Sequence, residues 1–223
     1  MKIGVLLPAR FEDSGDYLAD ACALDAAGVD SLWLPDDGFD PWLVLAGIAA
    51  VTGRVGLAAP ISAVDARAPE LLSRRIGTLE RLSRGRLFTT VPAAAAAATT
   101  EALVACARRC GPWPVMARLA SGAHLESAAR FANGLVVEAE PEQCRLVRDQ
   151  ALERRRRAGL EEPLALWATV PTPDGREHWR NLLGSYEAAG STGLIVPAGP
   201  RLLDLLRNGD EEDDRSDLTL AQG

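Results

Sequence analysis

The sequence contains very little lysine and histidine, and this scarcity excludes several kinds of chemistry. Lys2 is the only lysine among 24 basic residues, so no interior lysine can form a Schiff base. His124 and His178 are the only two histidines, which leaves a histidine-based metal site short of ligands. We therefore expect neither a Schiff-base enzyme nor a metal centre.

Paired cysteines, long apolar runs and net positive charge are also missing. The four cysteines show no C-x-x-C spacing, and three lie in apolar helical patterns, which predicts buried free thiols. No apolar run reaches the length of a membrane span, and Glu12 and Asp13 interrupt the N-terminal segment too early for a signal peptide. A net charge of −7 argues against a nucleic-acid partner. These features predict a soluble, cytoplasmic protein.

What the sequence does contain is a regular alternation of short apolar segments and amphipathic stretches. Glycine closes most of the amphipathic stretches, as expected at helix C-termini. Alternating strands and helices predict a parallel sheet, and eight strands match the (β/α)₈ TIM barrel. A doubly wound open sheet is the alternative, but no G-x-G-x-x-G follows the first strand. The eight predicted strands are Ile3–Leu7, Ser31–Leu34, Val55–Ala59, Leu87–Val91, Val115–Leu119, Gly134–Glu138, Leu164–Val170 and Gly193–Val196.

The chain divides into one barrel domain and a tail. Its 223 residues, 48% of them hydrophobic, suffice for a single domain of minimal barrel length, from residue 1 to about 207. Residues 208–223 carry an acidic run and few apolar side chains, which is typical of a disordered tail. The alanine run from Ala93 to Ala98 predicts the first turn of the fourth helix.

Several segments together resemble the bacterial-luciferase-like family of flavin- and deazaflavin-dependent oxidoreductases. The resemblance covers roughly half of the chain and preserves the order expected for a barrel. Its segments are AAGVDSLWLPDD, the DPW…LAGIAAVTGRVGLA run, ARAPELL, TLERLSRGRL and, more weakly, SGAHLESAARFANGLVV.

The resemblance implies an oxidoreductase or monooxygenase that holds reduced FMN or a deazaflavin across the mouth of the barrel. It further implies a homodimer formed through the second and third helices, over residues 41–51 and 69–82. The family's phosphate-binding turn corresponds to Ser121, Gly122, Ala123 and His124, which open a helix whose free N–H groups suit a phosphate. Ser121 is equally explained as a plain helix N-cap. Ser62 and Arg67, after the third strand, are expected nearby, and Arg67 could instead pair with Asp65.

Two adjacent carboxylates, Asp36 and Asp37, follow the second strand and are the candidate catalytic residues. On an extended chain at most one of them faces the mouth, where burial could raise its pKa for acid–base work. The alternative is a solvated turn, DDGFD, that caps the helix starting near Pro41. On the fifth strand, alternation places Arg118 on the same face as Met116, either in the barrel lumen or against a helix. We expect an ion pair there with an acid at a neighbouring strand end, such as Glu138.

Departures from the family pattern support a second hypothesis. Asp36–Asp37 stands where the family commonly has an Asp-His pair, and alanines replace a glycine-rich turn after the fourth strand. The long insertion before the fifth strand is absent, which leaves a connection close to the shortest crossover. The alternative is therefore a non-catalytic or partner-dependent barrel that binds no cofactor but keeps the fold and the dimer interface.

Overall fold

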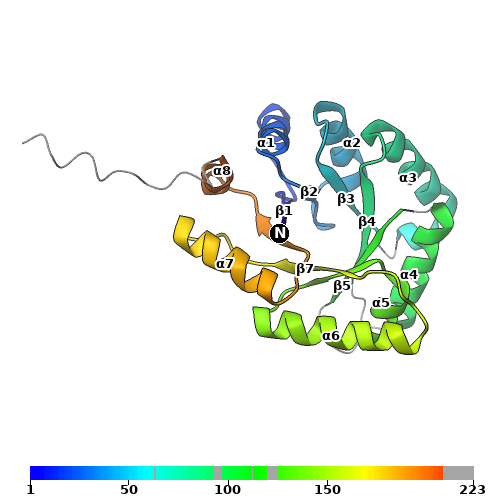
Figure 1. Cartoon of the computed structure of the whole chain (residues 1–223). Helices are drawn as coiled ribbons and strands as arrows, with labels where there is room; N and C mark the ends of the chain where they lie inside the picture. Colours follow the sequence, from blue (N-terminus) through cyan, green and yellow to red (C-terminus); the bar gives the residue numbers. More distant parts are fainter. Residues whose placement is uncertain (63, 93–96, 112, 120–124, 208–223) are drawn as a thin grey trace, which may run out of the picture.

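The structure is a closed barrel of eight parallel strands surrounded by helices (Figure 1). This computed structural model describes residues 1–62, 64–92, 97–111, 113–119 and 125–207. Each strand pairs with the next along the chain, and β8 closes on β1. The strands are β1 (Lys2–Leu6), β2 (Ser31–Trp33), β3 (Gly56–Pro60), β4 (Leu87–Val91), β5 (Val115–Leu119), β6 (Gly134–Val137), β7 (Ala165–Thr169) and β8 (Gly193–Pro197).

A helix follows every strand, and a short 3₁₀ helix precedes the third one. The predicted (β/α)₈ barrel is therefore confirmed, and the predicted strands agree with the observed ones apart from small shifts at their ends. The helices are α1 (Ser14–Ala26), α2 (Pro41–Val51), η1 (Asp65–Arg67), α3 (Pro69–Ser83), α4 (Ala97–Cys110), α5 (Leu125–Phe131), α6 (Pro141–Arg157), α7 (Arg176–Ala188) and α8 (Pro200–Arg207).

Local sequence signals explain where several helices begin. Asp13 caps α1 by accepting the N–H of Asp16, and proline occupies the first turn of α2, α3 and α6. Ala97 and Ala98 belong to α4, as the alanine run predicts, whereas residues 93–96 lie outside the described residues. In the described part of the chain, no helix is both long and apolar enough to cross a membrane.

Alternation along the strands divides the core into two parts. One set of side chains packs between the sheet and the helices and forms the large outer core. The other set fills the lumen, where Trp33, Phe88 and Trp167 pack together with centroid separations of 5.1 and 5.4 Å from the Trp33 ring. Trp33 is thus a core residue. The lumen is a packed apolar plug, as is usual for this fold.

The end of the barrel opposite the strand C-termini is fastened by two charged residues. The Asp25 carboxylate, on α1, accepts the backbone N–H groups of Gly53, Arg54 and Val55 at the start of β3. Arg86 donates to the carbonyls of Ala49, Thr52, Val55 and Ser83 and so satisfies the end of α2. Charged side chains at this end of the barrel therefore satisfy backbone groups and stabilise the fold.

Candidate active site

The C-terminal ends of the strands form the mouth of the barrel, which is where enzymes of this fold carry their chemistry. The loop after β2 contains Asp36 and Asp37, and the loop after β3 contains Ser62 and Arg67. The structure therefore brings four of the predicted site residues to adjacent loops on one side of the mouth.

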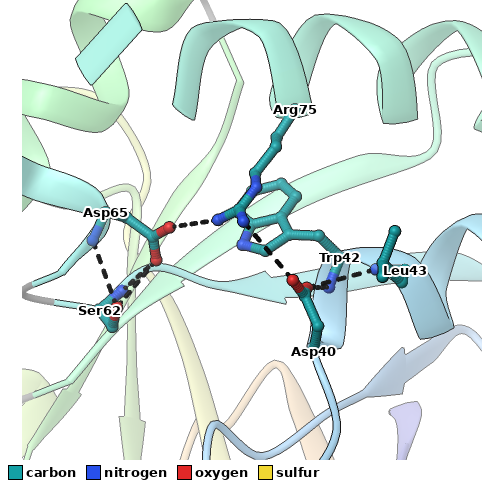
Figure 2. A network of polar contacts seen from close by, with 6 residues as sticks. All are labelled: Asp40, Trp42, Leu43, Ser62, Asp65 and Arg75. Carbon is teal, nitrogen blue, oxygen red and sulfur yellow. Dashed lines mark hydrogen bonds and ion pairs between the residues drawn. The ribbon is translucent and has the colours of Figure 1, made fainter. Parts of the chain in front are cut away.

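Asp65 organises the loop after β3. Its side chain is 9% exposed, and its Oδ2 accepts hydrogen bonds from the backbone N–H and the hydroxyl of Ser62, both at 2.9 Å. Its Oδ1 lies 2.9 Å from Arg75 Nη1 on α3. Ser62 is consequently held in place by a buried carboxylate, and its hydroxyl is already engaged (Figure 2).

Arg75 links this loop to the start of α2. Its guanidinium lies between Asp65 and Asp40 in Figure 2, and its Nη2 is 3.5 Å from Asp40 Oδ2. Asp40 is the N-cap of α2 and accepts the N–H groups of Trp42 and Leu43. The cap expected from the DDGFD turn is therefore confirmed. The sequence left two partners open for Arg67, a phosphate or Asp65. The structure does not show the pair with Asp65, because Arg75 pairs with that carboxylate and Arg67 is exposed on η1.

Asp36 and Asp37 are both exposed on the rim. Partial desolvation at the rim raises the pKa of Asp36, and the carboxylates of Asp65, Asp37 and Asp40 raise it further. The direction of this shift agrees with the catalytic hypothesis, whereas the exposure of both side chains agrees with the alternative of a solvated turn.

The loop carrying these two carboxylates rests on the loop after β1. Phe39 N–H donates to the carbonyl of Ala9, and a Cβ on Gly38 would come within 1.9 Å of that same oxygen. Phe11 packs between Tyr17 and Phe39, with ring centroids 4.5 and 4.9 Å apart. Only glycine permits this close approach of the two loops at position 38. The aromatic contacts of Phe11 then hold the two loops together at the rim of the mouth.

On the far side of the mouth, over β6, β7 and β8, lies a hollow of about 530 Å³. Glu138, Glu140, Thr169 and Tyr186 are among its lining residues. The Tyr186 hydroxyl donates to the carbonyl of Ala139 at 3.1 Å, which holds the loop after β6 against α7. The volume lies within the range of small-molecule sites, roughly 300–1,000 Å³.

Arg118 points from β5 into the barrel at its mouth end. It alternates with Met116 and is in register with Val136, and both of those residues belong to the lumen cluster. The predicted face is therefore correct, but the predicted partner is wrong. Within the described part of the chain, Arg118 forms no ion pair with Glu138 or with any other acid.

The predicted phosphate-binding turn, Ser121 to His124, lies outside the described residues. The helix expected after this turn is present as α5, which begins at Leu125. Arg118 is a cation near the mouth end of β5.

The residues around the mouth fit a flavin-type group in two respects. The aromatic plug of Trp33, Phe88 and Trp167 fills the lumen, so a planar ring system would lie across the mouth on an apolar floor. Arg118 supplies a cation for an anionic substituent. Among the described side chains, no three His, Cys, Asp or Glu residues are grouped closely enough to hold a metal ion.

Sequence reasoning missed two parts of this site. Arg75 is one of them, because its partners Asp40 and Asp65 lie 35 and 10 residues away along the chain and no local pattern connects them. The Ser62-x-x-Asp65 spacing is a local signal that could have revealed the turn. The hollow over β6–β8 is formed by three strand ends and two helices, and no single segment of the sequence encodes it.

This structure defines the protein as a (β/α)₈ barrel, a fold whose characterised enzymes bind their ligands at the strand C-termini. Its residues 1–103 match the family of luciferase-like monooxygenases. The resemblance recognised in the sequence is therefore confirmed, over the first four strands of the barrel. A sequence search among curated proteins returned no match.

Solved structures with the same fold carry related descriptions. The coenzyme F420-dependent tetrahydromethanopterin reductase of Methanopyrus kandleri has a TM-score of 0.73 at 13% identity, covering 94% of this chain and 97% of that one. An F420-dependent secondary alcohol dehydrogenase, in complex with an F420–acetone adduct, has a TM-score of 0.75 at 13% identity, covering 92% and 96%.

The oxygenating constituent of 3,6-diketocamphane monooxygenase from Pseudomonas putida, in complex with FMN, has a TM-score of 0.69 at 13% identity, covering 95% of this chain and 97% of that one. At these identities the likeness establishes the fold. The neighbours are flavin- or F420-dependent oxidoreductases and monooxygenases.

Proposed function

We propose that this protein is a luciferase-like oxidoreductase that binds reduced FMN or a deazaflavin across the mouth of its barrel. The observation that carries the proposal is the family match over residues 1–103, which contains the β2 and β3 loops of the mouth. The barrel's structural likeness to F420- and FMN-dependent enzymes supports the choice of cofactor class.

In this proposal the cofactor phosphate binds the backbone N–H groups of residues 121–124, as the family resemblance implies. Ser62 and Arg67 lie on the rim beside the cofactor. A bound flavin or deazaflavin would supply hydride transfer, and the protein would orient it and exclude water. Asp36, whose pKa is raised, would hold a proton at the rim for transfer to or from a substrate.

A titration with FMN tests this proposal directly. We expect FMN added to the purified protein to lose fluorescence on binding and to shift its absorption bands. The double variant Ser121→Ala, Gly122→Pro removes a hydroxyl, one donor and the turn geometry, and should bind FMN at least about tenfold more weakly. Unchanged affinity in that variant would mean that the phosphate lies elsewhere.

The second candidate is a barrel that has kept the fold but binds no cofactor. The connection between β4 and β5 supports it, because α4 is the one helix that the described residues of this connection form. This candidate would be favoured if the purified protein bound neither FMN nor a deazaflavin at millimolar concentration.

We further propose that two copies associate through α2 and α3. The α2 sequence has no polar residue, and Leu43 is 73% exposed on its outer surface. Leu71 and Leu82 on α3 are about half exposed. A groove of about 390 Å³ separates the two helices, with Trp42 and Leu79 among its lining residues. An apolar helix face on a barrel exterior is typical of a subunit interface.

A further inference from the structure

We propose that Arg118 is an anion-binding residue at the centre of the mouth, and that the molecule bound there presents a carboxylate or phosphate to it. The inference deepens the proposed function by naming a chemical group of the ligand, and it rests on the mouth being the site. No family motif in the sequence includes Arg118; the inference comes from its position and its lack of a partner.

Arg118 differs from the other inward-facing residues of the strands. Their side chains are apolar or carry a neutral hydroxyl, except for Lys2 at the opposite end of the barrel. The described mouth-end positions of the strands therefore contain one charged inward side chain. Just past the strands, Glu138 is the other charged residue on this face, so Arg118 is the one cation that these described positions offer to a negatively charged ligand.

The surroundings of Arg118 direct its guanidinium toward the mouth. Met116, one step deeper on the same strand, is 5% exposed and belongs to the aromatic plug with Trp33 and Trp167. Because these side chains fill the lumen, the guanidinium has no room below and must lie above them. It therefore meets solvent or a ligand on one side and apolar surface on the other.

Among the described residues, no side chain or carbonyl compensates the charge of Arg118. Arg118 is half-buried, and within the described residues it has no ion pair, no hydrogen bond from its guanidinium and no aromatic ring beneath it. Buried cations are normally paired. Arg155 illustrates the normal case, because its buried guanidinium donates to the carbonyls of Ala129, Ala132 and Glu162. The five donors of Arg118 are thus available for a ligand, and a carboxylate or phosphate matches their planar geometry.

One acid competes for this cation. Glu138 follows β6 two residues after Val136, on the same face, and is exposed at the hollow. Its carboxylate lowers the local positive potential without forming an ion pair. A second variant can therefore test the inference, because removing the Glu138 charge should strengthen anion binding.

The test uses four probes: inorganic phosphate, acetate, FMN and riboflavin, each titrated calorimetrically against the intact protein. Arg118→Met removes the charge but keeps an unbranched apolar side chain. We expect it to bind inorganic phosphate or acetate at least about tenfold more weakly, the loss of one charge-assisted contact. Glu138→Gln should bind the same anion more tightly. Arg109→Met, in the last turn of α4 at the opposite end, should bind as the wild type does.

The flavin arms identify where the anion comes from. If Arg118 binds the cofactor's phosphate, Arg118→Met loses affinity for FMN and keeps its affinity for riboflavin. If the anion belongs to a second ligand, FMN binding is unchanged and only phosphate or acetate binding is lost. Both outcomes support the inference.

Three outcomes would overturn it: unchanged binding of every probe by Arg118→Met, equal weakening of FMN and riboflavin, or no binding of phosphate, acetate or FMN by the wild type. A wild type that binds phosphate through Arg118 but neither flavin would refute the proposed function and leave this inference standing. Near-ultraviolet circular dichroism identifies a misfolded variant, and Arg118→Lys, which retains the charge, should then recover part of the binding.

Discussion

Trp33 lies so close to Gly4 that a Cβ on that glycine would come within 2.4 Å of the indole Nε1. The indole Nε1 donates to the Ser31 hydroxyl at 2.8 Å, which fixes the ring against β1. The same relation recurs where Met116 covers Gly134 and Trp167 covers Gly193. Large side chains on some strands can fill the lumen because the adjacent strands have glycine at the facing positions.

Gly4→Val should therefore destabilise the fold by about 1–3 kcal/mol, through overpacking of the lumen. In a Trp33→Leu background the added methyl groups meet a smaller side chain, so the same substitution should cost less. Urea unfolding of the two single variants and the double variant measures this coupling. Strictly additive free energies of unfolding would contradict the contact.

Asp25 should make stability depend on pH. Burial alone would raise its pKa, but three backbone N–H groups and Arg54 outweigh burial and hold the pKa below its ordinary value of 3.8. A carboxyl with a lowered folded-state pKa contributes stability above its unfolded pKa, and that contribution is lost as the pH falls through the folded value. Asp25→Ala should thus cost about 1–3 kcal/mol at pH 7 and progressively less below pH about 4.

Urea unfolding across this pH range provides the measurement for Asp25. Asp20→Ala is the matched control, because Asp20 is exposed on the same helix and its carboxylate caps no backbone group. A cost for Asp25→Ala that is equal at pH 7 and at pH 3 would show that the carboxylate charge does not matter.

The ion pair between Arg75 and Asp65 should contribute to the stability of the fold and to the position of Ser62 in the loop after β3. Arg75→Met leaves a carboxylate that is 9% exposed without its cation, and this should cost about 1–2 kcal/mol, since Arg75 is itself a third exposed and partly screened by solvent. Arg74→Met, an exposed neighbour on α3, should cost little. Asp65→Asn in the Arg75→Met background should recover part of the loss.

Thermal unfolding of these variants with and without FMN then separates stability from binding. If Arg75 positions Ser62 at the rim, Arg75→Met should also reduce the stabilisation that FMN provides. Equal unfolding temperatures for Arg75→Met and Arg74→Met would contradict the role given to this pair.

The sequence was sufficient to predict the barrel because its signals are local. Alternation within strands, glycine after helices and the Asp40-Pro41 start of α2 all lie within a few neighbouring residues, and each was confirmed. The polar contacts of the mouth are different. The partner of Asp65 is Arg75 and not the nearer Arg67, and that choice depends on how α3 packs on α2. Likewise, alternation gave the correct face for Arg118, but not the absence of an ion pair with Glu138.

Asp36→Asn should stabilise the protein at neutral pH. A carboxyl whose folded-state pKa is raised binds its proton more tightly in the fold, so its charged form opposes folding above the folded pKa. That penalty decreases as the pH falls below the folded pKa and is gone below the unfolded pKa, and the gain from Asn should decrease with it. Asp37→Asn, one residue along the same loop, is the comparison. A larger gain in stability from Asp37→Asn than from Asp36→Asn would contradict the assignment of the raised pKa to Asp36.

Leu43→Asp should abolish the dimer that we propose. Leu43 is 73% exposed on the apolar α2 surface, so an aspartate there is solvated in the monomer but would be buried without a partner in a dimer. Leu146→Asp is the matched control, because Leu146 is 57% exposed on α6, away from the α2 and α3 surface. Light scattering at micromolar concentration should give twice 23.7 kDa for the wild type and for Leu146→Asp, and 23.7 kDa for Leu43→Asp. A wild type that scatters only as the 23.7 kDa species would refute the dimer, and the exposed leucines of α2 and α3 would then require another partner.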